Sequence, residues 1–261
     1  MNATELLASP LLEGSSDWQM RYGERLALEG VLASLKPRLA IEIGTAQGGS
    51  LRRIAFHSEE VHSFDIAPEI KGLESELPNV HAHVGDSVVL VPEFLSGLEE
   101  EGREVDFALV DGDHSAAGVR RDAEALLASE ACRRTVLIFH DAANDDVRAG
   151  LEAVRFQDSA RVAYANLDFM PGYLVADPVR HLEIWNGLAI VLLDADRQKP
   201  TIEEFDFFDS ALVLRQARER AQARSEDIEA APGDRRGRAV ALASGTLLGL
   251  AAGLAAARAS R

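Results

Sequence analysis

Apolar runs of strand length alternate with longer amphipathic patterns through the centre of this chain, and this alternation constrains the fold more than any other feature. It predicts parallel strands joined by right-handed helical crossovers. The sequence therefore predicts an α/β fold with a doubly wound, seven-stranded, mostly parallel sheet. Strands are predicted near 39–43, 61–65, 80–84, 105–110, 135–139, 161–166 and 188–193, and helices near 49–58, 68–77, 88–100, 115–130 and 145–156.

The two ends of the chain differ from this pattern. Residues 1–36 read as a helical cap, because an apolar stripe at helical spacing precedes Pro37. The α/β domain is predicted over 37–212, followed by a charged helix and linker over 213–238 and an apolar Ala/Gly/Leu tail over 239–261. At 261 residues the chain is too short for two domains of ordinary size, so we expect one domain with extensions.

The apolar tail contains a run without charged residues, 239–257, that has arginines on both sides. Its length and flanks suit a membrane span, and glycines four residues apart would let another helix approach one face. Its high alanine content makes insertion marginal. Three alternatives stay open: membrane contact, a helix packed on itself or on a partner in a homo-oligomer, and a loosely ordered tail.

The charge balance narrows the class of partner. A formal net charge of -16 would repel a polyanion over most of the surface, which argues against nucleic acid and favours a small-molecule acceptor. The amino terminus lacks a charged start followed by an apolar run, so we expect no secretory signal and a cytoplasmic protein.

A glycine-bearing loop follows the first predicted strand. The strand 39–43 runs into Gly44-Thr45-Ala46-Gln47-Gly48-Gly49-Ser50 and then a helix, which is where an open parallel sheet binds a nucleotide-like ligand. Ala46 stands where a dinucleotide-binding loop has the glycine that admits a pyrophosphate. The loop therefore favours a cofactor without a pyrophosphate, and a simple glycine turn is the alternative.

Polar residues follow the next two predicted strands. Asp65 ends the second strand, where a carboxylate can accept hydrogen bonds from both ribose hydroxyls. Asp86 and Ser87 follow the third strand, within reach of an adenine. Each of these residues could instead cap the helix that follows it.

Acidic and imidazole side chains follow the fourth and fifth strands. Asp111-Gly112-Asp113-His114 ends one and His140-Asp141 ends the other, so these groups should share one crevice beside the cofactor. Such a cluster suggests a divalent cation. Farther along, segment 166–186 mixes aromatic and polar residues between the last two strands, as an acceptor pocket or lid would, although ordinary packing also explains it.

The segments EIGTAQGGS, SFDIAP, VGDS, FALVDGDHS and IFHD occur in this order at family spacing. Over residues 30 to 195 the chain thereby resembles the class I S-adenosylmethionine-dependent methyltransferases, and within them the branch of macrocin-type sugar O-methyltransferases and cephalosporin-hydroxylase-like proteins. The resemblance implies a Rossmann-like methyltransferase fold, S-adenosylmethionine as cofactor and methylation of a hydroxyl on a sugar or another small molecule.

The resemblance also assigns roles to residues. It places Glu42, Gly44 and Gly48 beside the methionine part of the cofactor, with Ser50 in the same loop, Asp65 at the ribose, and Asp86 and Ser87 at the adenine. Asp111 and Asp141 match metal-binding strand ends, and His114 matches the general base. His140 stands where related enzymes often have an acidic residue, so the predicted metal set is Asp111, His140 and Asp141, with Mg or Mn as candidate ions and imidazole favouring softer ones.

Two other functions compete with this interpretation. A metal-dependent hydroxylase would need two histidines and one carboxylate around a redox metal, which His114, His140 and one Asp could supply. A non-catalytic methyltransferase-like protein tethered through its tail is the second alternative.

Overall fold

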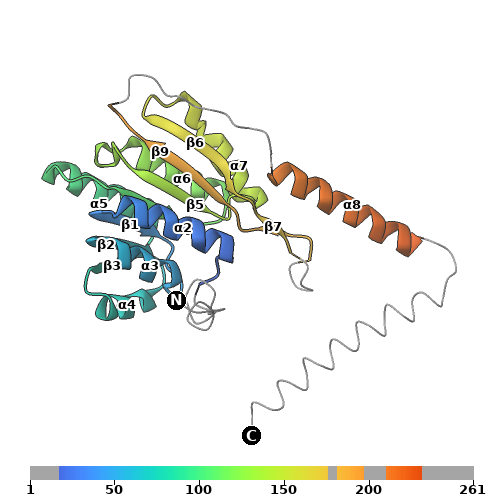
Figure 1. Cartoon of the computed structure of the whole chain (residues 1–261), viewed down its shortest axis with the longest axis horizontal. Coiled ribbons are helices and arrows are strands. Elements are labelled where there is room, and N and C mark those ends of the chain that lie inside the picture. Colours follow the sequence, from blue (N-terminus) through green and yellow to red (C-terminus); the bar gives the residue numbers. More distant parts are fainter. Residues whose placement is uncertain (1–17, 176–180, 197–209, 231–261) are drawn as a thin grey trace, which may run out of the picture. The chain divides into compact units, whose positions relative to one another are not determined.

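The structure is a computed structural model that describes residues 18–175, 181–196 and 210–230. Seven strands form one sheet in the order β3-β2-β1-β4-β5-β9-β6 (Figure 1). Neighbouring strands from β3 to β5 are parallel, whereas β9 runs antiparallel to both β5 and β6. The strands are β1 (Leu39–Ile43), β2 (Glu60–Asp65), β3 (Val80–Val84), β4 (Phe107–Val110), β5 (Val136–His140), β6 (Val162–Met170) and β9 (Leu188–Leu193).

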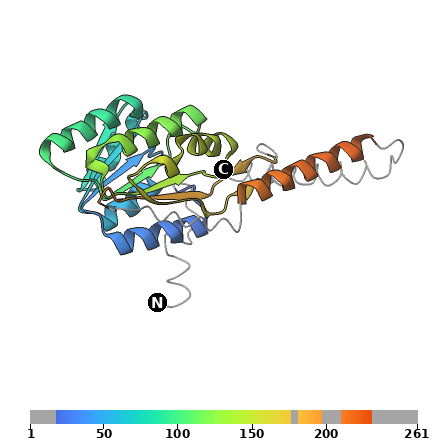
Figure 2. The same ribbon diagram turned by 90° about the horizontal axis from the view of Figure 1, so that it is seen from above.

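Helices cover both faces of the sheet, as the doubly wound prediction requires. Figure 2 shows α2 on one side of the sheet and the green helices α5 and α6 on the other. The described helices are α2 (Tyr22–Leu35), α3 (Gly49–His57), α4 (Lys71–Glu76), α5 (Ser87–Glu101), α6 (Ala116–Ala128), α7 (Asp145–Val154) and α8 (Ser210–Ala230). The predicted fold class is confirmed.

Two apolar cores lie on either side of the sheet, because strands buried on both faces carry continuous apolar runs. All five residues of β1 are buried. Ile41 and Ile43 pack with residues of α5, α6 and α7, whereas Ala40 packs with residues of α2, α3 and α4. The strand that leads into the first predicted ligand loop is therefore buried along its whole length.

Two parts of the sequence prediction differ from the structure. The helix predicted over 68–77 is a 3-10 turn, Pro68–Ile70, followed by the short α4. Segment 166–186 contributes an extended β6 and a two-stranded hairpin, β7 (Tyr173–Leu174) with β8 (Ile184–Trp185), which the sequence analysis did not predict as strands. The sheet and the candidate site lie within one compact unit of the chain, which ends at Gln216.

The ends of the chain are only partly described. The predicted cap over 1–36 corresponds to α2 where the structure describes it, and the predicted charged helix corresponds to α8, which begins at Ser210. The run 239–257 lies outside the described residues. Within the described part of the chain, no helix has both the length and the hydropathy that a membrane crossing needs.

Candidate active site

A cavity of about 1070 Å³ opens where the parallel strands end. Loops after β1, β2, β3, β4 and β5 all contribute to its wall, together with residues 18–21 before α2 and the hairpin residues Val175, Trp185 and Asn186. The position follows from the topology, because parallel strands bring their carboxyl ends to one edge of the sheet. A cavity of this size is large enough for a nucleoside cofactor and a small acceptor.

The first loop leaves β1 at Gly44, which has a φ of 85°. A Cβ atom at this position would lie 2.1 Å from the carbonyl oxygen of Asp111, so only glycine lets the β1 loop pass against the end of β4. Gly48, with a φ of 80°, precedes α3 as its N-cap. The loop geometry therefore depends on glycine at these two positions.

Replacing Gly44 with alanine should destabilise the protein by at least about 2 kcal/mol, since the left-handed backbone costs about 1 to 2 kcal/mol and the steric overlap adds to it. Urea unfolding would measure the change. Gly97→Ala in α5 is the matched control, because a Cβ there meets no heavy atom within 4 Å. This control should be neutral or more stable by about 1 kcal/mol, since alanine favours a helix. Equal stability of Gly44→Ala and wild type would contradict the packing argument.

Asp65 holds the same loop from the neighbouring strand. Its Oδ2 accepts hydrogen bonds from the backbone N–H groups of Thr45 (2.7 Å) and Ala46 (3.0 Å), and its Oδ1 accepts one from Ala67 (2.8 Å). Asp65 also borders the cavity. The carboxylate thus orders the loop and presents a charged acceptor to a ligand, so loop stabilisation and ribose binding are compatible roles for it.

Glu42 lies behind the cavity wall. Its side chain is fully buried and accepts hydrogen bonds from the hydroxyls of Ser50 (2.6 Å) and Ser63 (3.1 Å). Burial raises the pKa of Glu42 to about 8, although the two hydroxyl bonds oppose this. Neither Glu42 nor Gly48 borders the cavity, whereas Ser50 does. In this structure Glu42 reaches the cavity only by orienting Ser50.

The two residues predicted at the adenine are already hydrogen-bonded within the fold. Asp86 is the N-cap of α5 and accepts from the backbone N–H of Val88 (3.0 Å), as the capping alternative predicted. The Ser87 hydroxyl donates to Asp122 (2.9 Å), a buried carboxyl whose pKa is raised to about 6 mainly by burial. Both residues line the cavity, so their predicted contact with adenine stays a prediction.

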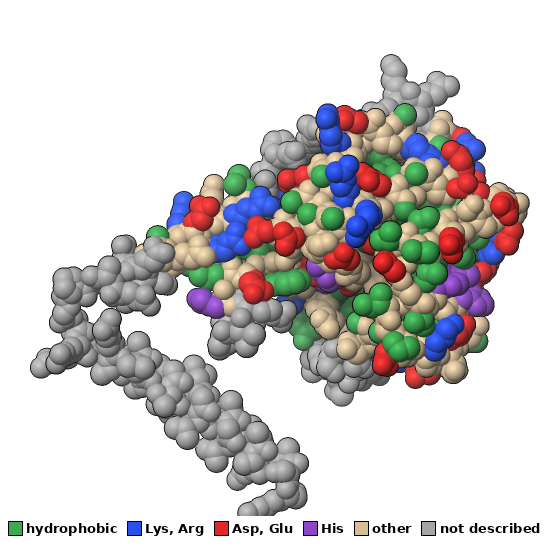
Figure 3. Space-filling view, turned by 180° about the vertical axis from the view of Figure 1, so that it is seen from behind, with side chains coloured by type: hydrophobic (Ala, Val, Ile, Leu, Met, Phe, Trp, Pro, Cys, Tyr) green, Lys and Arg blue, Asp and Glu red, His purple; other side chains and the backbone are tan. Residues whose placement is uncertain are grey.

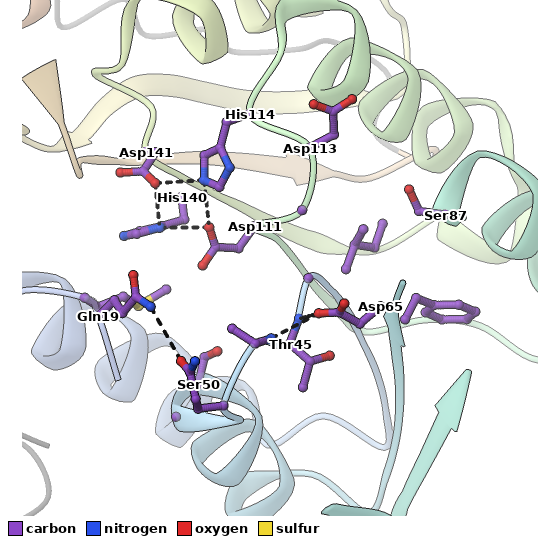
Figure 4. Close-up of a pocket in the computed structure, with 18 of the residues that line it drawn as sticks. Gln19, Thr45, Ser50, Asp65, Ser87, Asp111, Asp113, His114, His140 and Asp141 are labelled. Carbon is purple, nitrogen blue, oxygen red and sulfur yellow. Dashed lines mark hydrogen bonds and ion pairs between the residues drawn. The ribbon is translucent and has the colours of Figure 1, made fainter. Parts of the chain in front are cut away.

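Four side chains from the ends of β4 and β5 face one another, as Figure 4 shows. His114 Nε2 lies 2.9 Å from Asp141 Oδ2 and 3.5 Å from Asp111 Oδ1. His140 Nδ1 lies 2.9 Å from Asp111 Oδ1 and 3.4 Å from Asp141 Oδ2. The two carboxylates are therefore shared between two imidazoles.

The neighbouring Asp113 takes no part in this group. Its carboxylate accepts a hydrogen bond from the backbone N–H of Ser115 (2.9 Å), and in Figure 4 it points away from Asp111 and Asp141. Asp113 nevertheless lines the same cavity, as predicted for the acidic and imidazole groups of these strand ends, but its carboxylate does not join the paired group. The turn into α6 needs this side chain for its own backbone hydrogen bond.

The two imidazoles differ in burial and charge. His140 is buried, and the charges of Asp111 and Asp141 raise its pKa well above the usual value despite the cost of burial. Hydrogen bonds to Asp111 and Asp141 raise the pKa of His114 to about 10, although partial burial opposes this. Conversely, the charge of His140 and the hydrogen bonds from both imidazoles hold the carboxyl pKa values of Asp111 and Asp141 low despite their burial. At neutral pH this arrangement holds protons on both imidazoles.

Asp111, His114 and Asp141 have ligand atoms that all lie within 4.8 Å of one another, close enough to share one cation. The predicted metal set contained His140 in place of His114. Nδ1 of His140 also contacts both carboxylates, and its Nε2 lies 3.5 Å from Glu24 Oε1, so His140 as a ligand stays a prediction. A buried imidazolium there balances the charge of the surrounding carboxylates.

Glu24 belongs to this site but was not found by sequence reasoning. Glu24 of α2 is fully buried and accepts hydrogen bonds from the backbone N–H groups of Gly187 (2.6 Å) and Arg21 (2.6 Å). The Trp185 ring contacts His114 edge-on, with ring centroids 5.6 Å apart. Trp185 lies in the segment predicted as an acceptor pocket. Glu24 was missed, because the contacts that bring it to the site, with Gly187 and His140, join residues more than a hundred positions apart.

An open parallel sheet with a ligand cavity at the carboxyl ends of its strands defines a Rossmann-like, nucleotide-cofactor-binding α/β domain. Within that class, residues 41–142 match the family described as "Methyltransferase domain". This match, over 102 of the 261 residues, confirms the predicted resemblance to methyltransferases. No curated protein matches the sequence.

Several solved structures resemble this one at low sequence identity. An O-methyltransferase from Bacillus cereus in complex with S-adenosylhomocysteine (SAH) is 16% identical, with a TM-score of 0.47 over 73% of this chain and 90% of that one. The O-methyltransferase TomG from Streptomyces achromogenes, involved in tomaymycin synthesis, is 16% identical, with a TM-score of 0.48 over 74% and 91%. MycE from the mycinamycin biosynthetic pathway, in complex with Mg and SAH, is 16% identical, with a TM-score of 0.49 over 81% and 59%.

Proposed function

We propose that this protein transfers the methyl group of S-adenosylmethionine to a hydroxyl oxygen of a small molecule. One observation carries the proposal: a single cavity is bordered by the Gly44–Ser50 loop and Asp65 on one side and by Asp111, His114 and Asp141 on the other. A sulfonium donor and an acidic, imidazole-bearing acceptor site would thus be neighbours. The net charge of -16 supports a small molecule over nucleic acid as the acceptor.

The cofactor would bind along the ends of β1, β2 and β3. Asp65 would accept hydrogen bonds from the ribose hydroxyls, since it borders the cavity and the loop holds its carboxylate in place. Ser50, held by Glu42, would face the methionine part. Asp86 and Ser87 would border the adenine end. This pose leaves the sulfonium beside the end of β4.

In the reaction, the acceptor oxygen attacks the methyl carbon while the carbon–sulfur bond breaks, and S-adenosylhomocysteine leaves as a neutral thioether. The proton of the hydroxyl passes to Nε2 of His114. Holding both ligands in line supplies much of the rate enhancement, because well-oriented reactants gain about 7 to 11 kcal/mol. His114 must be neutral to accept the proton, so the negative charge of Asp111 and Asp141 has to be offset by something other than a proton on its ring.

A divalent cation, which the family resemblance implies, fits these residues. Asp111, His114 and Asp141 place two carboxylate oxygens and one imidazole nitrogen close together, a donor set suited to Mn²⁺ or Zn²⁺ as well as Mg²⁺. Asp111 and Asp141 would hold the cation, so that the lone pair of His114 Nε2 stays available for the proton. When bound, it would lower the pKa of the acceptor hydroxyl.

The test offers sugars, glycosylated metabolites and phenols to the purified full-length chain with S-adenosylmethionine and Mg²⁺ or Mn²⁺, and follows product mass. A product heavier by one methylene unit supports the proposal. A gain of one oxygen atom would instead support the hydroxylase alternative, for which His114 and His140 both contact Asp141. Absence of S-adenosylhomocysteine binding in calorimetry would favour the non-catalytic alternative.

Replacing Asp65 with alanine should weaken S-adenosylhomocysteine binding by about 10-fold to 150-fold, because a charge-assisted hydrogen bond contributes about 1.5 to 3 kcal/mol. Isothermal titration calorimetry measures the change. Glu93→Ala in α5 is the control, since this exposed carboxylate does not border the cavity. An Asp65→Ala protein that binds as tightly as Glu93→Ala would remove Asp65 from the cofactor site.

A further inference from the structure

A second group of histidines lies on β2 and β3, outside the cavity. His62 of β2 pairs in register with His81 of β3, and His83 is two residues farther along β3 on the same face. The ring centroid of His62 lies 4.9 Å from that of His81 and 5.2 Å from that of His83. Figure 3 shows histidine side chains gathered at the edge of the domain where β3 lies. His81 lies near the amino end of β3, whereas the cavity is at the carboxyl ends of the strands, and none of these histidines lines it.

Glu60, the first residue of β2, completes the group. Its Oε1 lies 2.8 Å from His62 Nε2, and its Oε2 accepts from Arg103 (2.5 Å). One ligand atom from each of Glu60, His62 and His81 lies within 4.8 Å of the other two. Two imidazole nitrogens and a carboxylate oxygen are a ligand set that proteins use for Zn²⁺, with a fourth position left for water.

The outer contacts of this group are those that a metal-binding histidine needs. Nδ1 of His62 lies 2.9 Å from Nε2 of His83, so the ring nitrogen that faces away from Glu60 has its own hydrogen-bond partner. Such a partner fixes the tautomer of a ligating histidine. His83 is in turn stacked on Phe64, with ring centroids 4.5 Å apart, and Arg103 fixes the carboxylate of Glu60.

The exposed position of His81 on the edge strand leaves the group open to solvent on one side, so an ion could enter without unfolding.

We propose that Glu60, His62 and His81 form a binding site for a divalent transition-metal ion of the Zn²⁺ type, separate from the cavity. The ion would tie the edge strand β3 to β2. Because β3 leads into Asp86 and Ser87 at the cavity wall, this bond would also stabilise the far end of the strand. The inference rests on the geometry of β2 and β3 and is independent of the methyl-transfer proposal.

The experiment measures Zn²⁺ binding by the full-length chain after treatment with a chelator. Asp141→Asn serves as the background, because it removes one ligand of the cavity cluster and leaves the β2–β3 group intact. Calorimetry and elemental analysis should find a tight Zn²⁺ site in this protein. Adding His81→Ala or Glu60→Gln should weaken it by at least about 100-fold, and His83→Gln by about 10-fold.

His181→Ala is the matched control, since it removes another exposed imidazole and should leave Zn²⁺ affinity unchanged. Circular dichroism verifies that each variant folds. If His81→Ala does not fold, Glu60→Gln still tests the proposal. Failure of the Asp141→Asn protein to bind Zn²⁺ would overturn the proposal. Zn²⁺ binding that neither His81→Ala nor Glu60→Gln weakens would overturn it as well.

Discussion

Replacing His114 with alanine should lower turnover by about 100-fold to 10,000-fold, the usual contribution of a general base. The expected loss follows from the position of the ring, which borders the cavity and contacts both Asp141 and Asp111. Affinity for S-adenosylhomocysteine should change little, because the residues proposed to hold the cofactor lie on the other side of the cavity. Steady-state kinetics and calorimetry on the same preparation measure both quantities.

Mn²⁺ binding separates the two roles that His114 could have. If His114 acts as the base, the alanine variant should bind Mn²⁺ as tightly as the wild-type protein. If His114 is a metal ligand, the variant should lose Mn²⁺ affinity as well as activity. His57→Ala is the control, since this imidazole pairs with Glu29 (2.8 Å) and does not border the cavity. Full activity of His114→Ala would exclude the residue from the mechanism.

Glu42 should contribute a fall in the free energy of unfolding as the pH rises from about 4.5 to 8, because its side chain is protonated in the fold over this range and ionised in the unfolded chain. The sign follows from the raised pKa: the unfolded state binds fewer protons, so each increase in pH favours it. A rise in the pKa of Glu42 from 4.5 to about 8 corresponds to about 5 kcal/mol. The loss is complete above the folded pKa.

Glu42→Gln should remove this contribution, because an amide keeps the size of the side chain and can still accept from Ser50. Urea unfolding at pH 5 and pH 8.5 measures the effect. We expect similar stability of the two proteins at the lower pH and a variant that is more stable, by up to about 5 kcal/mol, at the higher one. The exposed Glu93→Gln in α5 should show the wild-type pH dependence. A wild-type slope in Glu42→Gln would show that another group carries the pH dependence.

Local patterns predicted the elements of the central domain closely. The strand predicted at 39–43 is β1, and the helix predicted near 145–156 is α7. The two-residue strands β7 and β8 were missed, because two residues show no periodicity. The break between the 3-10 turn at Pro68 and α4 was also missed, since both parts are helical in pattern.

Most of the predicted site residues do border the cavity. Asp65, Asp111, His114 and Asp141 all border one cavity, as parallel strand ends require. Glu42 does not border it, because its side chain, next to the end of β1, is buried beneath the loop. The roles assigned to these residues remain predictions that the variants above would test.

The sequence alone determined the α/β class, the order of the elements and the strand ends at which polar residues gather, because apolar periodicity and turn residues are local properties. Only the tertiary structure decided which of those polar side chains meet. His114 turns toward Asp141 while Asp113 turns away, Glu24 reaches His140 from α2, and Glu60, His62 and His81 come together across β2 and β3. Such contacts join residues far apart in sequence through packing and strand register, and no local pattern of residues encodes them.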